Sequence, residues 1–463
     1  MFEPNDTIVF LWLAIAAVYG IGYVLLSLHS TVLALYGLFA VVTFGNFVSD
    51  YGLIPDQVNW LTEISILILF LKSVLLKKSG TIKQYSIFFP YILFLFSLFV
   101  VGSIIVNLSN PVSAVLCLRL MFRYVVMFIA LINLDLHEPD VRKVNKLIVF
   151  LVLIQLPVAT IKLFFYGQGE MAVGTYAGLH GGTLSTVLPL AVIPFAIGYY
   201  LHYRRSNIYF FIAFAFVGYS VIGGKRAFIF FLPPVFLYLF LAFGRRLIRQ
   251  LGTREWLLGS MLILGAVGVA TQYVDTLNPD KVGAWLGGGG KKGYGAVLEY
   301  AYRYNTLQSS EGVSQGRIST TLEIFNSVNE AGVVGWAFGF GPGSFLKSRF
   351  VGGSGNRNVS VGYGMTQLTW TLYQFGIVGT ILYFAIPLKL LLFTRRFYQS
   401  MQDPYWRALF FGLNALCFTE IMTGIAYCYN LLSDFLPCIF LYLAAVAVNK
   451  VKIIQSTGAP LEL

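Results

Sequence analysis

The chain has 463 residues, of which 57% are apolar, 16% are aromatic and only 11% are charged. An average soluble domain has about 25% charged residues. This composition excludes a soluble enzyme, a disordered chain and a nucleic-acid-binding domain, despite the net charge of +12. Because a helix that spans a bilayer needs about 20 apolar residues, we predict an all-α polytopic membrane protein with one sizeable loop.

Thirteen apolar segments predict transmembrane helices. The first two are separated only by a short segment around His29, so a single tilted or re-entrant arrangement is the alternative there. Residues 1–274 then hold ten helices, residues 275–365 form a large extracytoplasmic loop, and residues 366–463 hold three helices and a tail. The predicted helices cover residues 8–27, 29–48, 60–76, 85–106, 112–134, 147–166, 182–201, 207–222, 227–243, 256–274, 366–393, 406–425 and 429–448.

Basic residues in the short connections predict the orientation of these helices. They fall in alternate loops, which the positive-inside rule assigns to the cytoplasm, and they explain most of the net charge without an acidic partner. The N-terminus is then outside, as are the loops at about 167–181, 223–226 and 275–365. The cytoplasmic basic residues are Lys77, Lys78, Lys83, Arg142, Lys143, Lys146, Arg204, Arg205, Arg245, Arg246, Arg249, Arg254, Arg395, Arg396, Lys450 and Lys452.

Six ionisable residues fall in the outer half or near the middle of the predicted helices. Such residues are costly in lipid and by default indicate function, so they predict a polar chamber that opens to the outer leaflet. Arg119 and Arg123 share one helix face because they are four residues apart, and paired guanidinium groups suit a phosphate or pyrophosphate. Ion pairs with Glu420 or Asp434 are the alternative for these two arginines, and extension to the outer headgroups is the alternative for Lys162. The six residues are Glu63, Arg119, Arg123, Lys162, Glu420 and Asp434.

Four short motifs lie in the predicted outer segments or beside them. The sequence GTYAGLHGGTLSTVLPLAV leads into the seventh helix, and GGKRAF places Lys225 and Arg226 in an outer turn, where backbone amides and two cations make an anion site. In the large loop, Gly316 and Arg317 open a helix-like run, RISTTLEIFNSV, and GFGPGSF follows it. The next transmembrane helix contains FGIVG. The run has an apolar face formed by Ile318, Leu322, Ile324, Phe325 and Val328.

In their order and sidedness, these motifs resemble the bacterial O-antigen ligase and O-antigen polymerase superfamily, over residues of about 170–385. The resemblance implies a GT-C-like membrane glycosyltransferase that moves a glycan from undecaprenyl pyrophosphate to a hydroxyl, on the outer face of the bacterial plasma membrane. A polymerase uses the next lipid-linked repeat unit as acceptor, whereas a ligase uses lipid A–core. Ligases carry a histidine that would fall near Met365, and no histidine lies nearby. This departure favours a polysaccharide polymerase.

The resemblance implies functional arginines at Arg226 and Arg317. The donor's leaving group departs as an anion, so the reaction needs preorganised positive charge more than a strong acid. We therefore expect Arg226 and Arg317 to stabilise the pyrophosphate, and Lys225, Arg119 and Arg123 to help hold it. Alternatively, Lys225 and Arg226 are an accidental surface pair.

A base near neutral pKa would take the proton of the acceptor hydroxyl. His180 is the predicted base, with Glu170 and Glu323 as alternatives, and Glu323 is also a candidate for substrate binding. Two readings compete with these roles. His180 is alternatively a loop histidine that bonds to the backbone, and Arg317 is alternatively the partner of Glu323 or Glu330 in a structural ion pair.

The sequence predicts neither a metal nor another cofactor. The outer loops contain no Asp-x-Asp motif, the four histidines are scattered, and Cys117, Cys417, Cys428 and Cys438 all lie in apolar segments that suit small buried side chains. We expect a metal-independent reaction, and the resemblance implies inversion at the sugar. The expected partners are the lipid-linked oligosaccharide and membrane lipid, with a chain-length regulator and a flippase as candidate protein partners.

A flippase or transporter for lipid-linked oligosaccharide is the alternative from another class. It would also use a basic chamber, but one open to alternating sides. Transporters of that kind often show internal repeats, and the two halves of this sequence show none.

Overall fold

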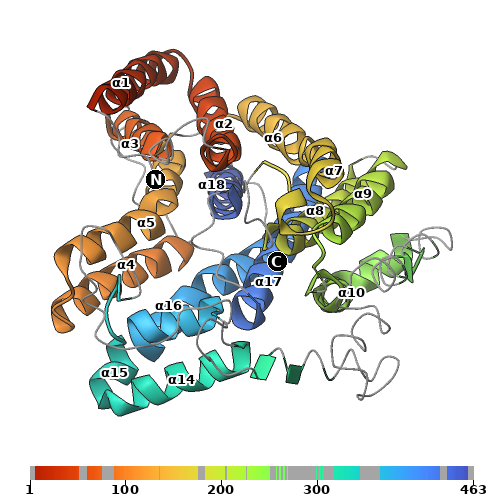
Figure 1. The fold of residues 1–463 in the computed structure, drawn as a ribbon. Coiled ribbons are helices and arrows are strands. Elements are labelled where there is room, and N and C mark those ends of the chain that lie inside the picture. The colour runs from red at the N-terminus through yellow and green to blue at the C-terminus, as the bar shows by residue number, and fades with distance from the viewer. Residues whose placement is uncertain are drawn as a thin grey trace. The chain divides into compact units, whose positions relative to one another are not determined.

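The computed structural model describes residues 6–51, 60–75, 88–134, 136–175, 183–203, 206–225, 227–250, 316–344, 365–427 and 435–456, with isolated residues between 257 and 306. These residues form helices and contain no β-strand (Figure 1). Among them, eight helices are long and apolar enough to cross a membrane. The described part of the chain thus agrees with the predicted all-α polytopic membrane protein.

The helices follow the predicted spans closely. The first two are separate, since α1 ends at His29 and Ser30 caps the start of α2 with its side chain. The predicted span at 147–166 lies within one candidate span, Glu138–Tyr166, in which α6 and α7 meet at Ile154. The predicted span at 256–274 lies outside the described residues apart from isolated positions. The bounds are α1 (Asp6–His29), α2 (Thr31–Asp50), α3 (Trp60–Leu75), α4 (Phe88–Val106), α5 (Pro111–Asn133), α6 (Glu138–Leu153), α7 (Gln155–Tyr166), η3 (Glu170–Ala172), α8 (Leu184–His202), α9 (Ile208–Ile222), α10 (Ala227–Gln250), α14 (Arg317–Glu330), α15 (Gly332–Phe338), α16 (Gln367–Tyr398), α17 (Pro404–Ala426) and α18 (Phe435–Ser456).

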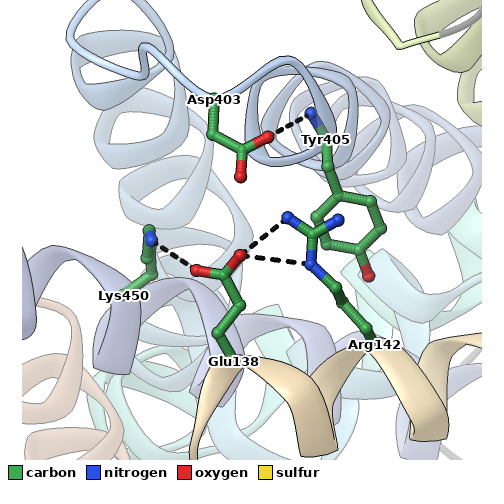
Figure 2. Close-up of polar contacts among 5 residues, drawn as sticks. All are labelled: Glu138, Arg142, Asp403, Tyr405 and Lys450. Atoms are coloured by element: carbon green, nitrogen blue, oxygen red, sulfur yellow. Dashed lines mark hydrogen bonds and ion pairs between the residues drawn. The ribbon is translucent and has the colours of Figure 1, made fainter.

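The chain divides into two compact units, which are described separately. The first comprises residues 1–85, 122–184 and 434–461. In it, α2 contacts α1, α3, α6 and α18. Glu138, the first residue of α6, accepts hydrogen bonds from Arg142 (2.6 Å to Nη2) and from Lys450 near the end of α18 (2.9 Å), as Figure 2 shows. The start of α6 and the end of α18 therefore lie together, as the predicted orientation of their basic residues requires.

The second unit comprises residues 86–121 and 185–433 with the last two residues of the chain. Here α16 and α17 pack side by side, while α4 and α15 contact α16 and α10 contacts α17 (Figure 1). The end of α8 meets the end of α16, where the Tyr398 hydroxyl lies 2.9 Å from His202 Nε2. Asp403 caps the start of α17 by accepting a hydrogen bond from the backbone N–H of Tyr405 (Figure 2). These ends are the ones that the sequence places on the cytoplasmic side.

The helix-like run of the large loop is α14, as predicted, but its apolar residues do not form one buried face. Ile324 and Val328 are fully buried, whereas Ile318, Leu322 and Phe325 are exposed. Helix α14 therefore has a buried apolar stripe and a separate exposed one.

Candidate functional site

Tyr427, which directly follows α17, connects four helices of the second unit. Arg317, the first residue of α14, donates a hydrogen bond from Nε to the Tyr427 carbonyl (3.2 Å) and places its guanidinium 5.0 Å from the centre of the Tyr427 ring. Thr186, in the first turn of α8, donates to the Tyr427 hydroxyl (3.2 Å), and Phe231 of α10 approaches the ring at 5.7 Å between centroids. We call Thr186, Arg317 and Tyr427 the Tyr427 cluster.

The turn between α9 and α10 lies against the start of α8, next to this cluster. A side chain at Gly223 would collide with Ser185, the neighbour of Thr186. Gly224 has a φ of +64°, a left-handed conformation that glycine adopts most easily. These two glycines bring the half-buried Lys225 to the end of α8 that also contacts Tyr427. The turn that holds Lys225 and the start of α14, both predicted to be outside, therefore lie at the same end of the second unit.

The guanidinium of Arg317 is held by a carbonyl and an aromatic face rather than by a carboxylate. Gly316 is extended (φ −70°, ψ 162°) and starts the helix, which places Arg317 in its first turn. Neither Glu323 nor Glu330, both described in the structure, forms an ion pair with Arg317, so the predicted structural ion pair is not present. Among the described residues, only Nε of this guanidinium donates a hydrogen bond. The Nη groups keep donor capacity suited to an anionic ligand.

The carboxylate of Glu420 lies on α17, further from the end of the helix that Tyr427 follows. Glu420 precedes Tyr427 by seven residues, close to two turns, so both residues share one face of α17. Thr423 lies between them on that face and is fully buried. The polar face of α17 therefore continues inward from the Tyr427 cluster, at a depth where the sequence predicts a polar chamber.

The structure gives Arg123 a carboxylate partner that the sequence did not suggest. In the first unit its Nη1 lies 3.9 Å from Oε1 of Glu63 on α3, and its guanidinium is 4.9 Å from the centre of the Tyr124 ring. The carboxylates proposed for this ion pair were Glu420 and Asp434, and Asp434 lies outside the described residues. Arg119 lies one turn before Arg123 on α5, as the spacing predicts.

Lys162 does not extend to the headgroups. Its side chain is buried, with 4% of the residue exposed, and Nζ donates to the carbonyls of Val173 (2.9 Å) and Gly174 (3.0 Å). The rings of Phe47 and Tyr51 lie 5.3 and 5.4 Å from this nitrogen. Lys162 thus fastens the segment after η3 onto α7, because carbonyl oxygens and aromatic faces both stabilise a desolvated ammonium group.

Several predicted residues cannot be placed. His180 and Arg226 lie outside the described residues, and only the backbone of Glu170 is described, in η3. Their predicted roles stay predictions. Cys117, Cys417 and Cys438 are buried thiols, as expected, and Cys428 lies outside the described residues. The described residues contain no group of three or more side chains suited to a metal ion.

Sequence reasoning missed Thr186 and Tyr427. Thr186 lies inside the motif before the seventh helix but carries no charge, and Tyr427 reads as one of many aromatic residues at a membrane interface. The available signal was position, because both residues fall at predicted outer ends of helices.

Comparisons with protein families and with curated proteins add no relative, since no family model and no curated protein matches the chain.

Proposed function

We propose that the chain is a GT-C-like membrane glycosyltransferase that polymerises a polysaccharide. It transfers the growing glycan from undecaprenyl pyrophosphate to a sugar hydroxyl of a lipid-linked repeat unit, on the outer face of the bacterial plasma membrane. The observation that supports this proposal most strongly is the contact of Arg317 with Tyr427, which is itself bonded to Thr186. It unites segments that are far apart in sequence and that carry the resemblance to the polymerase and ligase superfamily.

The proposed reaction forms a bond between the acceptor oxygen and the anomeric carbon of the donor sugar. The bond from that carbon to the pyrophosphate oxygen breaks, and undecaprenyl pyrophosphate leaves with the electron pair. Arg226 and Arg317 stabilise the negative charge that develops on the leaving group, because preorganised donors in a water-poor site do so effectively. Lys225 helps to hold the diphosphate. The acceptor proton passes to a base, for which His180 is the candidate.

Tyr427 is a positioning residue in this proposal. Its carbonyl accepts the hydrogen bond of Arg317 Nε, and its ring covers one face of the guanidinium. Both contacts restrain the guanidinium through Nε and the ring, and they leave the Nη groups as donors for the ligand. Thr186 fixes the phenol in turn through its hydroxyl.

Met365, two residues before α16, favours a polymerase over a ligase within this proposal. Met365 is buried where the resemblance implies a ligase histidine, and Thr366 then caps the helix. A buried thioether offers no proton-transfer group at this position. A flippase receives no support from a specific contact.

The test is reconstitution with lipid-linked single repeat units extracted from cells that lack the protein, without metal or nucleotide. We expect the wild-type protein to build a ladder of chain lengths and Arg317→Ala to lose it. Arg303→Ala is the matched control, because Arg303 lies in the same loop, is exposed and, among the residues that the structure describes, forms an ion pair with nearby Glu299 alone. A normal ladder from Arg317→Ala would overturn the role of this residue. Transfer to lipid A–core without a ladder would replace the polymerase with a ligase.

A further inference from the structure

Helix α14 presents three different faces. Thr320, Ile324 and Val328 are fully buried against the protein. Glu323, Asn326 and Glu330 form a polar face. The third face carries Ile318, Leu322 and Phe325 at the i, i+4, i+7 spacing of one helix stripe, with exposed fractions of 48%, 59% and 38%. A helix with one protein face, one apolar face and one polar face suits the boundary between protein, lipid and water.

The exposed apolar surface continues beyond α14. Val333 and Val334, at the start of α15, are 85% and 53% exposed. Trp336 follows on α15, where its ring lies 5.9 Å from that of Phe325 and its indole N–H donates to Asn329. The Phe325 and Trp336 rings therefore join the two helices into one surface.

The end of α15 contacts the apolar helix α4 well before the end of α4 that the sequence places outside. Phe338 stacks on Phe99 of α4 with 5.3 Å between ring centroids and 3° between planes, and its carbonyl accepts a hydrogen bond from Ser103 (3.0 Å). Phe99 lies seven residues before the end of α4, which is about 10 Å along a helix that rises 1.5 Å per residue. The end of α15 is therefore at membrane depth if α4 spans the bilayer.

Helix α16 is broken at the same place. Gly376 has a φ of +64°, and the break frees the carbonyls of Tyr373 and Gln374, which accept hydrogen bonds from the N–H groups of Phe340 (2.8 Å) and Gly341 (2.9 Å). A side chain at Gly376 would collide with the backbone of α15. Non-helical backbone is tolerated at membrane depth only where protein satisfies it, and here the loop does so.

The helices beside this contact present apolar side chains outward. Directly after the break in α16, Ile377 and Ile381 are 45% and 62% exposed, and Leu98 and Ile105 are exposed on α4. These are the surfaces that face lipid if α4 and α16 cross the membrane. The segment that carries the exposed stripe contacts α4 through Phe338 and α16 through the backbone of Phe340 and Gly341. The stripe is therefore continuous with surfaces that face lipid, which makes lipid the expected contact of the stripe.

We propose that α14 and α15 lie in the outer lipid leaflet. Ile318, Leu322 and Val333 contact acyl chains, while Glu323 and Glu330 face the water, and α15 descends beside the break in α16. This arrangement holds Arg317 at the level of the lipid headgroups, the level of the diphosphate in any lipid-linked substrate. The lipid contact itself does not depend on the proposed catalytic activity.

The test measures lipid and water contact along α14 in the full-length protein reconstituted in phosphatidylethanolamine–phosphatidylglycerol vesicles. Single cysteines replace Leu322, Val333, Glu323 or Glu330 in a background without the four native cysteines, and each carries a nitroxide label. We expect collision with oxygen, relative to a water-soluble nickel complex, to be severalfold higher at 322 and 333 than at 323 and 330. Equal collision with the nickel complex at all four positions would overturn the proposal.

A second measurement replaces only Cys428, which lies outside the described residues, and keeps the other native cysteines. These three thiols are buried, so Leu322→Cys and Glu323→Cys can be compared in intact cells with an impermeant thiol reagent. We expect Glu323→Cys to react and Leu322→Cys to be protected. Equal reaction at both positions would assign the stripe to water and would contradict the lipid contact whether or not the protein polymerises glycans.

Discussion

The two ends of the segment that begins with α14 are held in different ways. At its start, Arg317 contacts the carbonyl and ring of Tyr427, and its guanidinium keeps donor capacity. At its end, Gly339 and Gly341 are fixed by backbone contacts with the broken helix α16. The two ends carry two kinds of motif. The glycines let two backbones approach closely, and the arginine supplies hydrogen-bond donors and positive charge for a ligand. Changes at the two ends should therefore affect different properties.

The largest effect is expected at the break in α16. Gly376→Ala adds a Cβ in a left-handed conformation and against the backbone of Trp336 and Ala337. We expect it to lower the free energy of unfolding by about 4 kcal/mol, at the upper end of single substitutions. The measurement is the yield of folded protein and its thermal stability in detergent.

Gly102→Ala is the control for this change, because Gly102 lies in α4 with open space around its Cα. It should keep wild-type stability. If Gly376→Ala were as stable as Gly102→Ala, the close packing of the α15 backbone against the break in α16 would not contribute to stability.

At the other end, Arg317→Ala should leave stability nearly unchanged and lower the polymerisation rate by about 10²–10³, the usual cost of removing one charge-stabilising donor. Arg317→Lys should also be impaired, because lysine keeps the charge and loses the planar fork. Initial rates at matched protein levels measure both variants. Loss of folded protein in Arg317→Ala would instead assign the residue a structural role.

A smaller effect is expected from Gln374, whose buried Oε1 accepts from the N–H of Gly343 (2.9 Å) and lies 3.3 Å from the Cys117 thiol. Gln374→Leu leaves that buried N–H unpaired and should cost about 2 kcal/mol of stability. Gln374→Glu should restore the acceptor only at the cost of a buried charge. Denaturation in detergent measures both, and a neutral Gln374→Leu would show that the loop does not need this contact.

The smallest effect is expected from Tyr427→Phe. It keeps the carbonyl and the ring that hold Arg317 and removes only the hydroxyl that accepts from Thr186, a hydrogen bond worth about 1 kcal/mol. Tyr427→Ala removes the ring and should lower kcat more than Tyr427→Phe with little change in KM, as expected of a positioning residue. Equal activity of the two variants would exclude a role for the ring.

Hydropathy predicted most of the fold because apolar length determines where a helix can span a bilayer. It could not predict the separation of α6 from α7 at Ile154, since every residue there is compatible with a helix. Nor could it predict the break at Gly376, because glycine is common within transmembrane helices and only the approach of Gly339 requires a break.

The site was predictable only in part. The position of Arg317 after a glycine at a helix start was visible in the sequence, and the helix is present. Tyr427 and Thr186 were not, because their role arises from contacts between segments that hydropathy treats independently. The burial of Lys162 was also missed: a long side chain near a helix end suggests extension to the headgroups, and only the fold brings two carbonyls within its reach.

The most direct test of the central claim is a double-mutant cycle in the reconstituted polymerisation reaction. Single-turnover rates are measured for the wild-type protein, Arg317→Ala, Tyr427→Ala and the double variant. If Tyr427 acts by positioning Arg317, the double variant should be no slower than Arg317→Ala alone, because the interaction has already been lost. Effects that multiply, or a wild-type protein that forms no ladder from lipid-linked repeat units, would contradict the account.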